Sequence, residues 1–430
     1  MSAAAAMIAP RSEAALYISA RRVGEWSLAL IVFLGAFVIV EPAPYELALV
    51  FLTIGWAILG LRVDRYLLPL VLLLVLYVVG GLIGLTMVDS FGDPIIYLGT
   101  TILLAASAIL FAAIIAVDPS RRLQVIVNAY VIGGVAASII GILGYFGGLE
   151  FFTLYGRARG TFQDPNVFGP FLMLPFSYLI YSIFTAQARR PLLSVAAAFV
   201  MLIALFLTFS RATWGMTAFV VPLIATLAFI NHRNGTERAR VIVYVSVGAV
   251  LGVVAIAVVL SLPGTADLFA ERAQLVQSYD AGAFGRFERQ LLGLSLIFEK
   301  PFGVGPFQFG KIFGEDEHNM WLKGFMVYGW LGGFAYIALA VWTVVISVPL
   351  LFKRRPWQPI IISAFCAYLG HLIVHSVIDN DHWRHLFLIY GILWGGYVAE
   401  RRWEKPTPTT AGAIPKTQIF RAAISRAFAP

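Results

Sequence analysis

Charged residues and cysteine are both scarce in this sequence. Asp, Glu, Lys and Arg supply 13% of the 430 residues, whereas soluble domains carry about a quarter. This shortage excludes an ordinary soluble domain. The single cysteine, Cys366, excludes a disulfide within the chain, and its apolar neighbours favour a packed thiol. No Ala-x-Ala cleavage site follows the first apolar run, so we expect that run to remain as a membrane span.

Hydrophobic residues make up 60% of the chain and gather in long unbroken runs. A helical span needs about 20 apolar residues to cross roughly 30 Å of hydrocarbon, and a membrane barrel would show short alternating strands instead. The sequence therefore predicts an all-α membrane protein, one domain over residues 1–430, with about twelve transmembrane helices. The predicted spans are 24–40, 45–61, 66–88, 95–117, 123–147, 167–186, 191–209, 212–230, 241–261, 319–351, 359–378 and 385–400.

The basic residues set the predicted orientation of these spans. With the loops assigned to alternate sides, 21 of the 31 Lys and Arg residues fall on the side of the N-terminus and ten on the other. Cytoplasmic loops are the ones enriched in Lys and Arg, so both termini are predicted to be cytoplasmic. The segment 262–317, between spans nine and ten, becomes one large outside loop. The tail 401–430 is predicted to be a disordered cytoplasmic segment.

Several arginines lie on the side that disfavours them. Arg157 and Arg159 share an outside loop, and Arg211 follows a very short connection between two apolar runs. An arginine at the edge of the membrane needs a negative partner. Anion binding explains all three. The alternatives are lipid headgroups or a carboxylate such as Glu150 for Arg157 and Arg159, and a nearby carboxylate of the protein for Arg211.

The outside loop contains a predicted amphipathic helix over residues 284–299. Its apolar positions recur at spacings of three and four, which gives one apolar face. Arg286, Arg289 and Gln290 share another side, which could face an anion. The alternative is an interfacial helix whose arginines touch lipid headgroups. The apolar positions are Phe287, Leu291, Leu294 and Phe298.

His318 follows three consecutive acidic residues, at the mouth of span ten. An imidazole there can act as a general base near neutral pH, although a local hydrogen-bonded pair is the more ordinary reading. A metal site is an alternative both here and around His371 and His375. Neither spacing matches an established metal pattern, so no metal is expected at either place.

In sequence order, these features resemble the O-antigen ligase and polymerase family of bacterial membrane glycosyltransferases. The shared pieces are the segment 157–166, Ser210-Arg211 at the start of a span, Arg286 followed by Pro301 to Gly305, and His318-Asn319 followed after nine residues by Gly329 and then Gly332. The resemblance implies a twelve-span helical fold with a large periplasmic loop. It also implies transfer of a glycan from undecaprenyl pyrophosphate without a nucleotide or metal cofactor.

The resemblance also suggests roles for individual residues. Arg211 and Arg286 would carry the charge of the departing pyrophosphate, with Arg289, Arg157 and Arg159 as helpers, because guanidinium groups match phosphate oxygens bidentately. His318 would take the proton of the acceptor hydroxyl, and Asn319 or Glu317 would orient it. A single displacement with inversion follows as the expected mechanism.

The expected function is therefore that of an O-antigen ligase in the bacterial inner membrane, with its active site facing the periplasm. Its partners would be the lipid-linked donor, a sugar hydroxyl of the lipid A-core, and the bilayer, but no nucleic acid. A polymerase of lipid-linked repeat units remains an alternative that uses the same donor. A transporter for an anionic solute is an alternative of another class, and it would need arginines near the middle of the membrane.

Overall fold

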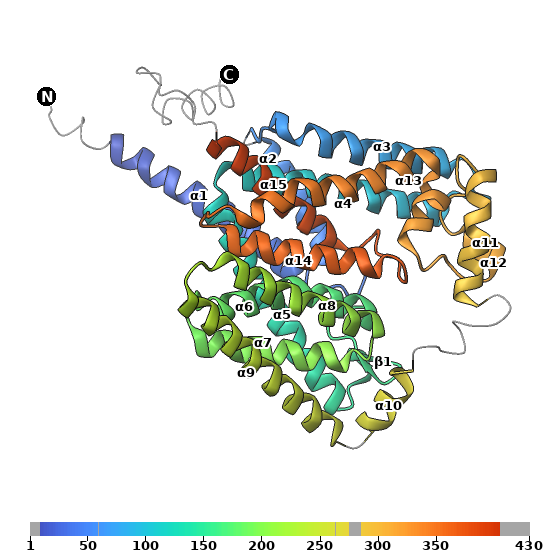
Figure 1. Ribbon diagram of the computed structural model, residues 1–430. Coiled ribbons are helices and arrows are strands. Elements are labelled where there is room, and N and C mark those ends of the chain that lie inside the picture. The colour runs from blue at the N-terminus through green and yellow to red at the C-terminus, as the bar shows by residue number, and fades with distance from the viewer. Residues whose placement is uncertain (1–8, 59, 263, 275–284, 405–430) are drawn as a thin grey trace, which may run out of the picture.

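The computed structural model describes residues 9–58, 60–262, 264–274 and 285–404. Long helices run side by side through it and a shorter set caps one end (Figure 1). Each predicted span coincides with one long helix. These are α1 (Ala9–Leu34), α2 (Pro44–Ile58), α3 (Leu68–Leu85), α4 (Gly92–Val117), α5 (Pro119–Phe146), α6 (Pro165–Phe184), α7 (Pro191–Leu207), α8 (Arg211–Asn231), α9 (Gly235–Leu260), α13 (Met320–Ser347), α14 (Gln358–Val374) and α15 (Arg384–Glu404).

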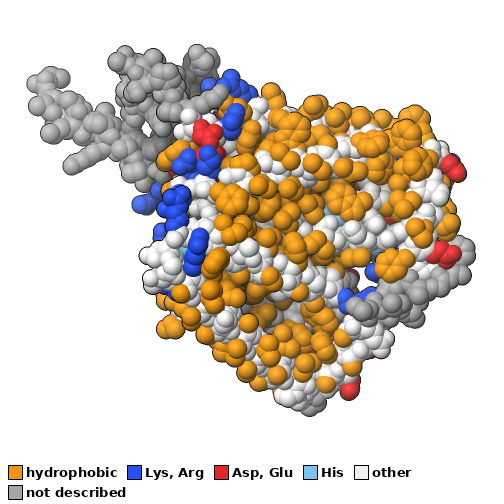
Figure 2. All heavy atoms as spheres, viewed as in Figure 1, with side chains coloured by type: hydrophobic (Ala, Val, Ile, Leu, Met, Phe, Trp, Pro, Cys, Tyr) orange, Lys and Arg blue, Asp and Glu red, His pale blue; other side chains and the backbone are white. Residues whose placement is uncertain are grey.

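The helices have the length and composition of a membrane protein. Among the described residues, seven are long and apolar enough to cross a bilayer, and three shorter apolar helices, α2, α7 and α14, accompany them. Apolar side chains cover the middle of the molecule, while Lys and Arg gather at the end where α15 finishes (Figure 2). An all-α membrane protein is therefore confirmed. The number of twelve spans and the orientation remain predictions.

Close helix contacts at small residues hold the core of the bundle together. A Cβ atom on Gly80 of α3 would lie 2.8 Å from the Cα atom of Gly332 in α13, and one on Gly395 of α15 would lie 2.7 Å from Cβ of Ile115 in α4. Only glycine allows backbones to approach this closely. Gly80 and Gly332 thus allow α3 and α13 to pack closely.

Helix α13 is broken at Gly329, where φ is 63° and ψ is −172°. The turn after α11 (Arg286–Glu299) crosses α13 at this break: the N–H of Trp330 donates to the carbonyl of Pro301 over 2.8 Å, and the N–H of Val304 donates to that of Met326 over 2.7 Å. A Cβ atom on Gly329 would lie 2.8 Å from the Pro301 oxygen. The Pro301–Gly305 motif thus anchors the segment between α9 and α13 to α13 itself.

The described part of the predicted loop 262–317 contains three helices rather than one: α10 (Thr265–Arg272), α11 and α12 (Gln308–Phe313). α11 matches the predicted helix, although residue 284 lies outside the described part. The short α10 and α12 were missed because neither is long enough to show an apolar period. The predicted apolar face of α11 is exposed; its members Phe287, Leu291, Leu294 and Phe298 are 51%, 65%, 49% and 80% accessible.

Several helix ends differ from the predicted spans by four residues or more. α1 ends at Leu34 rather than at residue 40, α9 begins at Gly235 rather than at residue 241, and α14 ends at Val374 rather than at residue 378. The first and last long helices also extend beyond their predicted spans: α1 begins at Ala9 rather than near residue 24, and α15 continues to Glu404 rather than stopping at residue 400. Both extensions contain charged residues, so a hydropathy profile does not count them as part of a span. The helices nevertheless continue through them, because proline occurs only in the first turn of α1, where a helix tolerates it. The predicted tail thus begins inside α15, and residues 405–430 lie outside the described part. A short hairpin, β1 (Thr153–Leu154) and β2 (Arg157–Ala158), joins α5 to α6.

Candidate functional site

A cavity of about 590 Å³ opens at the end of the bundle where α11 lies. Segments far apart in the sequence line it, and four of them are helix starts: Asn166 of α6, Arg211 of α8, Arg286 of α11 and His318 just ahead of α13. The ends of α10 and α14 also contribute to its wall. The first N–H groups of a helix are unsatisfied, and the helix dipole is positive there. Four helix starts around one cavity make a region suited to a negatively charged group.

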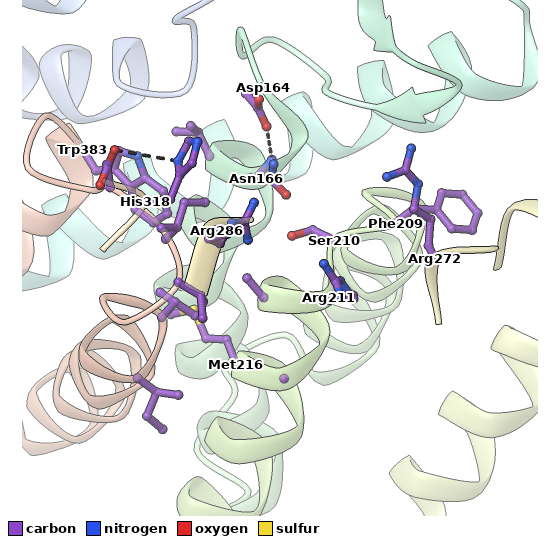
Figure 3. A pocket seen from close by; sticks show the side chains of 18 of the residues that line it. Asp164, Asn166, Phe209, Ser210, Arg211, Met216, Arg272, Arg286, His318 and Trp383 are labelled. Carbon is purple, nitrogen blue, oxygen red and sulfur yellow. Dashed lines mark hydrogen bonds and ion pairs between the residues drawn. The ribbon is translucent and has the colours of Figure 1, made fainter. Parts of the chain in front are cut away.

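Arg211 and Arg286 face this shared space (Figure 3). Each is the first residue of its helix, so its guanidinium adds to the positive end of the helix dipole. In the view of Figure 3, Arg286 lies between Arg211 and His318. The structure therefore brings together the three residues predicted to carry the chemistry.

The backbone ahead of Arg211 is tightly constrained. Phe209 adopts a left-handed φ of 44°, which is uncommon for a bulky residue. The Ser210 hydroxyl accepts from the N–H of Thr213 at 3.3 Å and caps α8. The Arg211 side chain donates to the carbonyl of Gln274, beyond the end of α10, at 3.3 Å. This strained turn determines the first residue of α8 and therefore the position of Arg211 at the cavity.

Arg157 and Arg159 hold the hairpin loop in place. Arg157 is 8% exposed, and it donates to the Thr208 carbonyl at 2.7 Å and to Oδ1 of Asn166 at 2.8 Å. Arg157 also lines the cavity, whereas Arg159 does not. Arg159 donates instead to the carbonyl of Phe151 at 3.0 Å. The contacts therefore give both arginines a scaffolding part, and only Arg157 can also reach a ligand in the cavity.

The conformation of His318 is imposed by α11. Its φ is 44°, again in the left-handed region. The Gln290 side chain donates to the carbonyl of His318 at 3.2 Å and to that of Glu317 at 3.3 Å. Asn319 caps α13 through its Oδ1, and its Nδ2 donates to Gln290 Oε1 at 3.4 Å. Strained backbone of this kind clusters at functional sites, and here Gln290 and Asn319 hold it.

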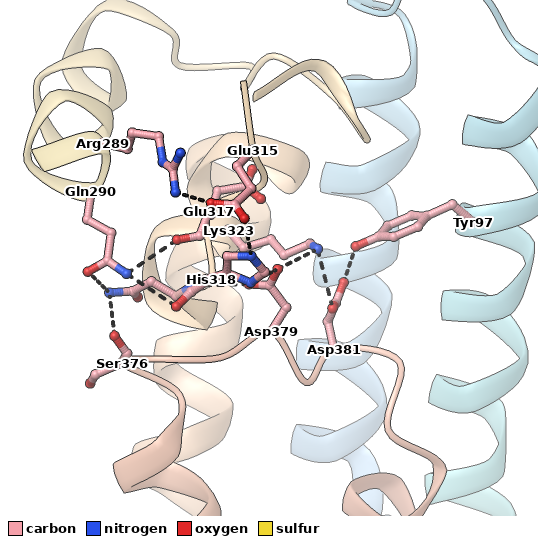
Figure 4. Close-up of polar contacts among 11 residues, drawn as sticks. Tyr97, Arg289, Gln290, Glu315, Glu317, His318, Lys323, Ser376, Asp379 and Asp381 are labelled. Carbon is pink, nitrogen blue, oxygen red and sulfur yellow. Dashed lines mark hydrogen bonds and ion pairs between the residues drawn. The ribbon is translucent and has the colours of Figure 1, made fainter. Parts of the chain in front are cut away.

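Asp379 is the acidic partner of His318 (Figure 4). Its Oδ2 lies 3.8 Å from Nδ1 of the imidazole, and its Oδ1 accepts from the N–H of Asn319 at 3.1 Å. On the other side of the ring, Glu315 lies 3.9 Å from Nε2, but Glu315 is exposed and is also paired with Arg289. The structure thus places Asp379, rather than Asn319 or Glu317, where it can orient the imidazole.

A buried lysine holds Asp379 in place. Nζ of Lys323 lies 3.3 Å from Oδ2 of Asp379 and 3.8 Å from Oδ1 of Asp381, and its side chain is 9% exposed. Asp381 also accepts from Tyr97 and, at 3.2 Å, from Tyr328. Every member of this buried network has a partner, which buried charges require. The network makes Asp379 a fixed part of the cavity wall.

Glu317 lies beneath the cavity rather than in its wall, and it is 3% exposed. Burial removes water from its carboxylate and raises its pKa to about 8, against the opposing charge of Lys323. The folded protein thus favours the protonated form. The stability that this proton contributes is complete below about pH 4.5 and is lost as the pH rises through about 8.

Replacing Glu317 with Gln should therefore remove part of the loss of stability at alkaline pH, because the amide stays neutral. The gain at pH 9 should reach a few kcal/mol at most, on the scale of about 1.4 kcal/mol per unit of pKa shift. Thermal unfolding of the protein in detergent between pH 5 and 9 measures it. Glu299→Gln, at an exposed site, is the control. Equal pH dependence in wild type and Glu317→Gln would contradict the assignment.

The eight residues predicted for the site divide evenly in the described structure. Arg157, Arg211, Arg286 and His318 line the cavity, whereas Arg159, Arg289, Asn319 and Glu317 support it from outside. Sequence reasoning missed Arg272, at the end of α10, and Asp379, both of which line the cavity. Asp379 lies in the polar turn after α14, and its position on the outside in the predicted topology was the available signal.

The histidines of α14 are packed in the core. His371 and His375 are fully buried, and Nε2 of His375 lies 2.7 Å from the hydroxyl of Tyr336. In the part of the chain that the structure describes, no group of three or more His, Cys, Asp or Glu side chains is placed to hold a metal ion.

Comparison with known proteins gives no independent support for the family resemblance. No protein-family model matches the chain, and no curated protein matches it either.

Proposed function

We propose that this protein is a membrane glycosyltransferase that moves a glycan from a polyprenyl pyrophosphate to a sugar hydroxyl, as an O-antigen ligase does. One observation carries the proposal: Arg211, Arg272 and Arg286 share a cavity with a histidine that faces a fixed carboxylate. Arginines suit a diphosphate, and the histidine suits a hydroxyl that must lose its proton. The sequence resemblance supports the same reaction.

The donor's pyrophosphate fits the cationic part of the cavity. When the bond from the anomeric carbon to the phosphate oxygen breaks, negative charge grows on the departing diphosphate. Fixed guanidinium groups and helix N-termini stabilise that charge without having to reorganise. Arg211 and Arg286 stand at such N-termini. With a volume of about 590 Å³, the cavity is within the range of about 300–1,000 Å³ that is typical of small-molecule sites.

His318 would act on the acceptor. In the proposed reaction the neutral imidazole carries its proton on Nδ1, which faces Asp379 at 3.8 Å, and Nε2 accepts the proton of the attacking hydroxyl. The acceptor oxygen then bonds to the anomeric carbon as the phosphate leaves from the opposite side. One displacement of this kind inverts the configuration at that carbon. The proton ends on His318 and the electron pair on the diphosphate.

The exposed face of α11 suits the polyprenyl chain of the donor. Phe287 belongs both to the cavity wall and to that face. From there Leu291, Leu294 and Phe298 continue along the helix, all about half exposed or more. An apolar track that starts beside the arginines would let the diphosphate enter the cavity while its chain remains in lipid. The predicted orientation puts this site at the periplasmic face of the inner membrane.

Asp379→Asn should slow transfer by about 10- to 100-fold, the range seen when a partner that orients a catalytic imidazole or ligand is lost. The amide cannot hold the imidazole in the productive tautomer, while the arginines that bind the donor are untouched. We expect kcat to fall with little change in the KM of the donor, and Asp379→Glu to recover part of the loss. A raised KM with kcat unchanged would assign Asp379 to donor binding instead.

Reconstitution of the purified protein in liposomes tests the proposed function. Liposomes containing a polyprenyl-pyrophosphate-linked glycan and a lipid A-core acceptor should yield glycosylated lipid A-core and free polyprenyl pyrophosphate. A product in which lipid-linked units are joined to one another would identify a polymerase. Passage of the anion across the bilayer without any release of polyprenyl pyrophosphate would favour the transporter and refute the glycosyltransferase.

A further inference from the structure

A second pocket, of about 370 Å³, lies at the other end of the bundle. It is lined by Asp64, Arg65 and Tyr66 ahead of α3, and by Arg401 and Arg402 in the last turn of α15. α15 begins beside the arginine-lined cavity and has 21 residues, which span about 30 Å. That length equals the hydrocarbon thickness of a bilayer. The pocket therefore lies at the opposite membrane surface, which the predicted orientation makes cytoplasmic.

Two guanidinium groups in this pocket share one aromatic ring. Arg65 and Arg401 lie over the ring of Tyr66, at 5.2 and 5.4 Å from its centre. Arg402 is fixed separately: it pairs with Asp64 at 2.6 Å and donates to the Ala116 carbonyl at 2.8 Å. The ring thus holds two cations close together, in a position where they repel one another.

The carboxylates near the pocket do not neutralise it. Asp64 is engaged by Arg402. Glu404 lies 3.8 Å from Arg401 but is bound more closely, at 2.9 Å, by Lys353. Within the described residues, Arg65 forms no ion pair with a carboxylate. The pocket therefore presents an excess of positive charge, which an anion would complement.

The surroundings place the pocket at the level of lipid headgroups. Trp403 is 56% exposed, meets the ring of Trp357 edge to face, and carries Arg355 over its ring at 4.9 Å. Tryptophan and tyrosine gather at membrane interfaces. Val63 and Leu68, on either side of Arg65 in the chain, are 50% and 60% exposed. The cationic pocket would suit the anionic headgroup of a phospholipid, and the exposed apolar side chains beside it would suit the acyl chains.

We propose that Arg65, Tyr66 and Arg401 bind the phosphate of an anionic phospholipid from the cytoplasmic leaflet, and that Val63 and Leu68 contact its acyl chains. Guanidinium groups recognise phosphate oxygens bidentately, and basic groups at a membrane surface attract anionic lipids. The site is independent of the proposed transfer reaction. It would anchor α15 and the start of α3, and α15 leads to the catalytic cavity at its other end.

The double variant Arg65→Gln/Arg401→Gln tests this site in the full-length protein. Native mass spectrometry of protein purified with phosphatidylglycerol should show one lipid retained by wild type and its affinity lowered about 10- to 30-fold in the variant, as expected for two lost basic contacts. Arg189→Gln/Arg190→Gln removes two exposed arginines from another loop of the same predicted face and is the matched control. Equal retention in the double variant and wild type would overturn the proposal.

A second measurement separates a lipid from a free anion and does not depend on the double variant folding. Thermal stability of wild type and of the single variant Arg65→Gln is measured with phosphatidylglycerol, with phosphatidylcholine and with inorganic phosphate. We expect only phosphatidylglycerol to stabilise, and to stabilise wild type more than the variant. If inorganic phosphate stabilises the protein as much as phosphatidylglycerol does, the site binds free anions. If phosphatidylcholine stabilises it as much, the negative charge of the lipid headgroup is not recognised. Either result overturns the proposal.

Discussion

His318→Ala should abolish glycan transfer, with a rate at least about 10²- to 10⁴-fold lower, the usual contribution of a general base. Alanine removes the imidazole that takes the proton of the acceptor hydroxyl; Asp379 lies on the Nδ1 side of the ring, and the Glu315 carboxylate near Nε2 is paired with Arg289. The binding of the donor should change little, since the arginines remain. The lipopolysaccharide ladder on a gel, from cells that depend on this protein, measures the effect in vivo. The reconstituted reaction measures it in vitro.

The control for this change is His232→Ala. His232 lies between α8 and α9, at the opposite end of α8 from Arg211, and pairs with Glu237 at 3.1 Å. It should leave the ladder intact. A wild-type ladder from the His318→Ala protein, inserted at normal levels, would end the assignment of His318 as the base.

Arg211→Lys and Arg286→Lys should each lower transfer by about 10²- to 10³-fold, the cost of removing one stabilising donor from a developing anion. Lysine keeps the charge, but it has a single ammonium group and cannot grip two phosphate oxygens in one plane. If the loss appears in kcat more than in KM, these arginines act mainly on the transition state.

Arg159→Lys is the matched control for these two substitutions. Arg159 lies outside the cavity and donates to backbone carbonyls, which an ammonium group can also satisfy. Most of the activity should survive in this variant. Full activity in Arg211→Lys and Arg286→Lys would instead give those arginines a structural part and would leave the cavity without its proposed ligand.

Local sequence patterns predicted much of the fold and part of the candidate site. The apolar runs correspond to the long helices, and the period of Phe287, Leu291 and Leu294 correctly separated the two sides of α11. Both signals depend on neighbours within a few residues, which the sequence displays directly. His318 could be singled out for the same reason, since its acidic neighbours are adjacent in the chain.

The remaining parts of the site depend on contacts across the chain. Asp379 meets His318 only because α13 and α14 pack side by side, and Arg272 reaches the cavity through a helix too short to show a period. Glu317 looks like its exposed neighbour Glu315, yet it is buried. Arg159 looked like an anion ligand, but the nearby carbonyls occupy it. Local sequence reports which groups are present, whereas tertiary packing decides which of them face the ligand.

Gln290 connects α11 to the proposed base by a hydrogen bond. Arg286 and Gln290 are one helical turn apart, and the Gln290 amide grips the carbonyl of His318. If a diphosphate bound to Arg286 displaces α11, Gln290 moves with the helix, and its hydrogen bond displaces the backbone of His318 as well. An anion bound to Arg286 would in this way be coupled, through one helix and one hydrogen bond, to the position of His318.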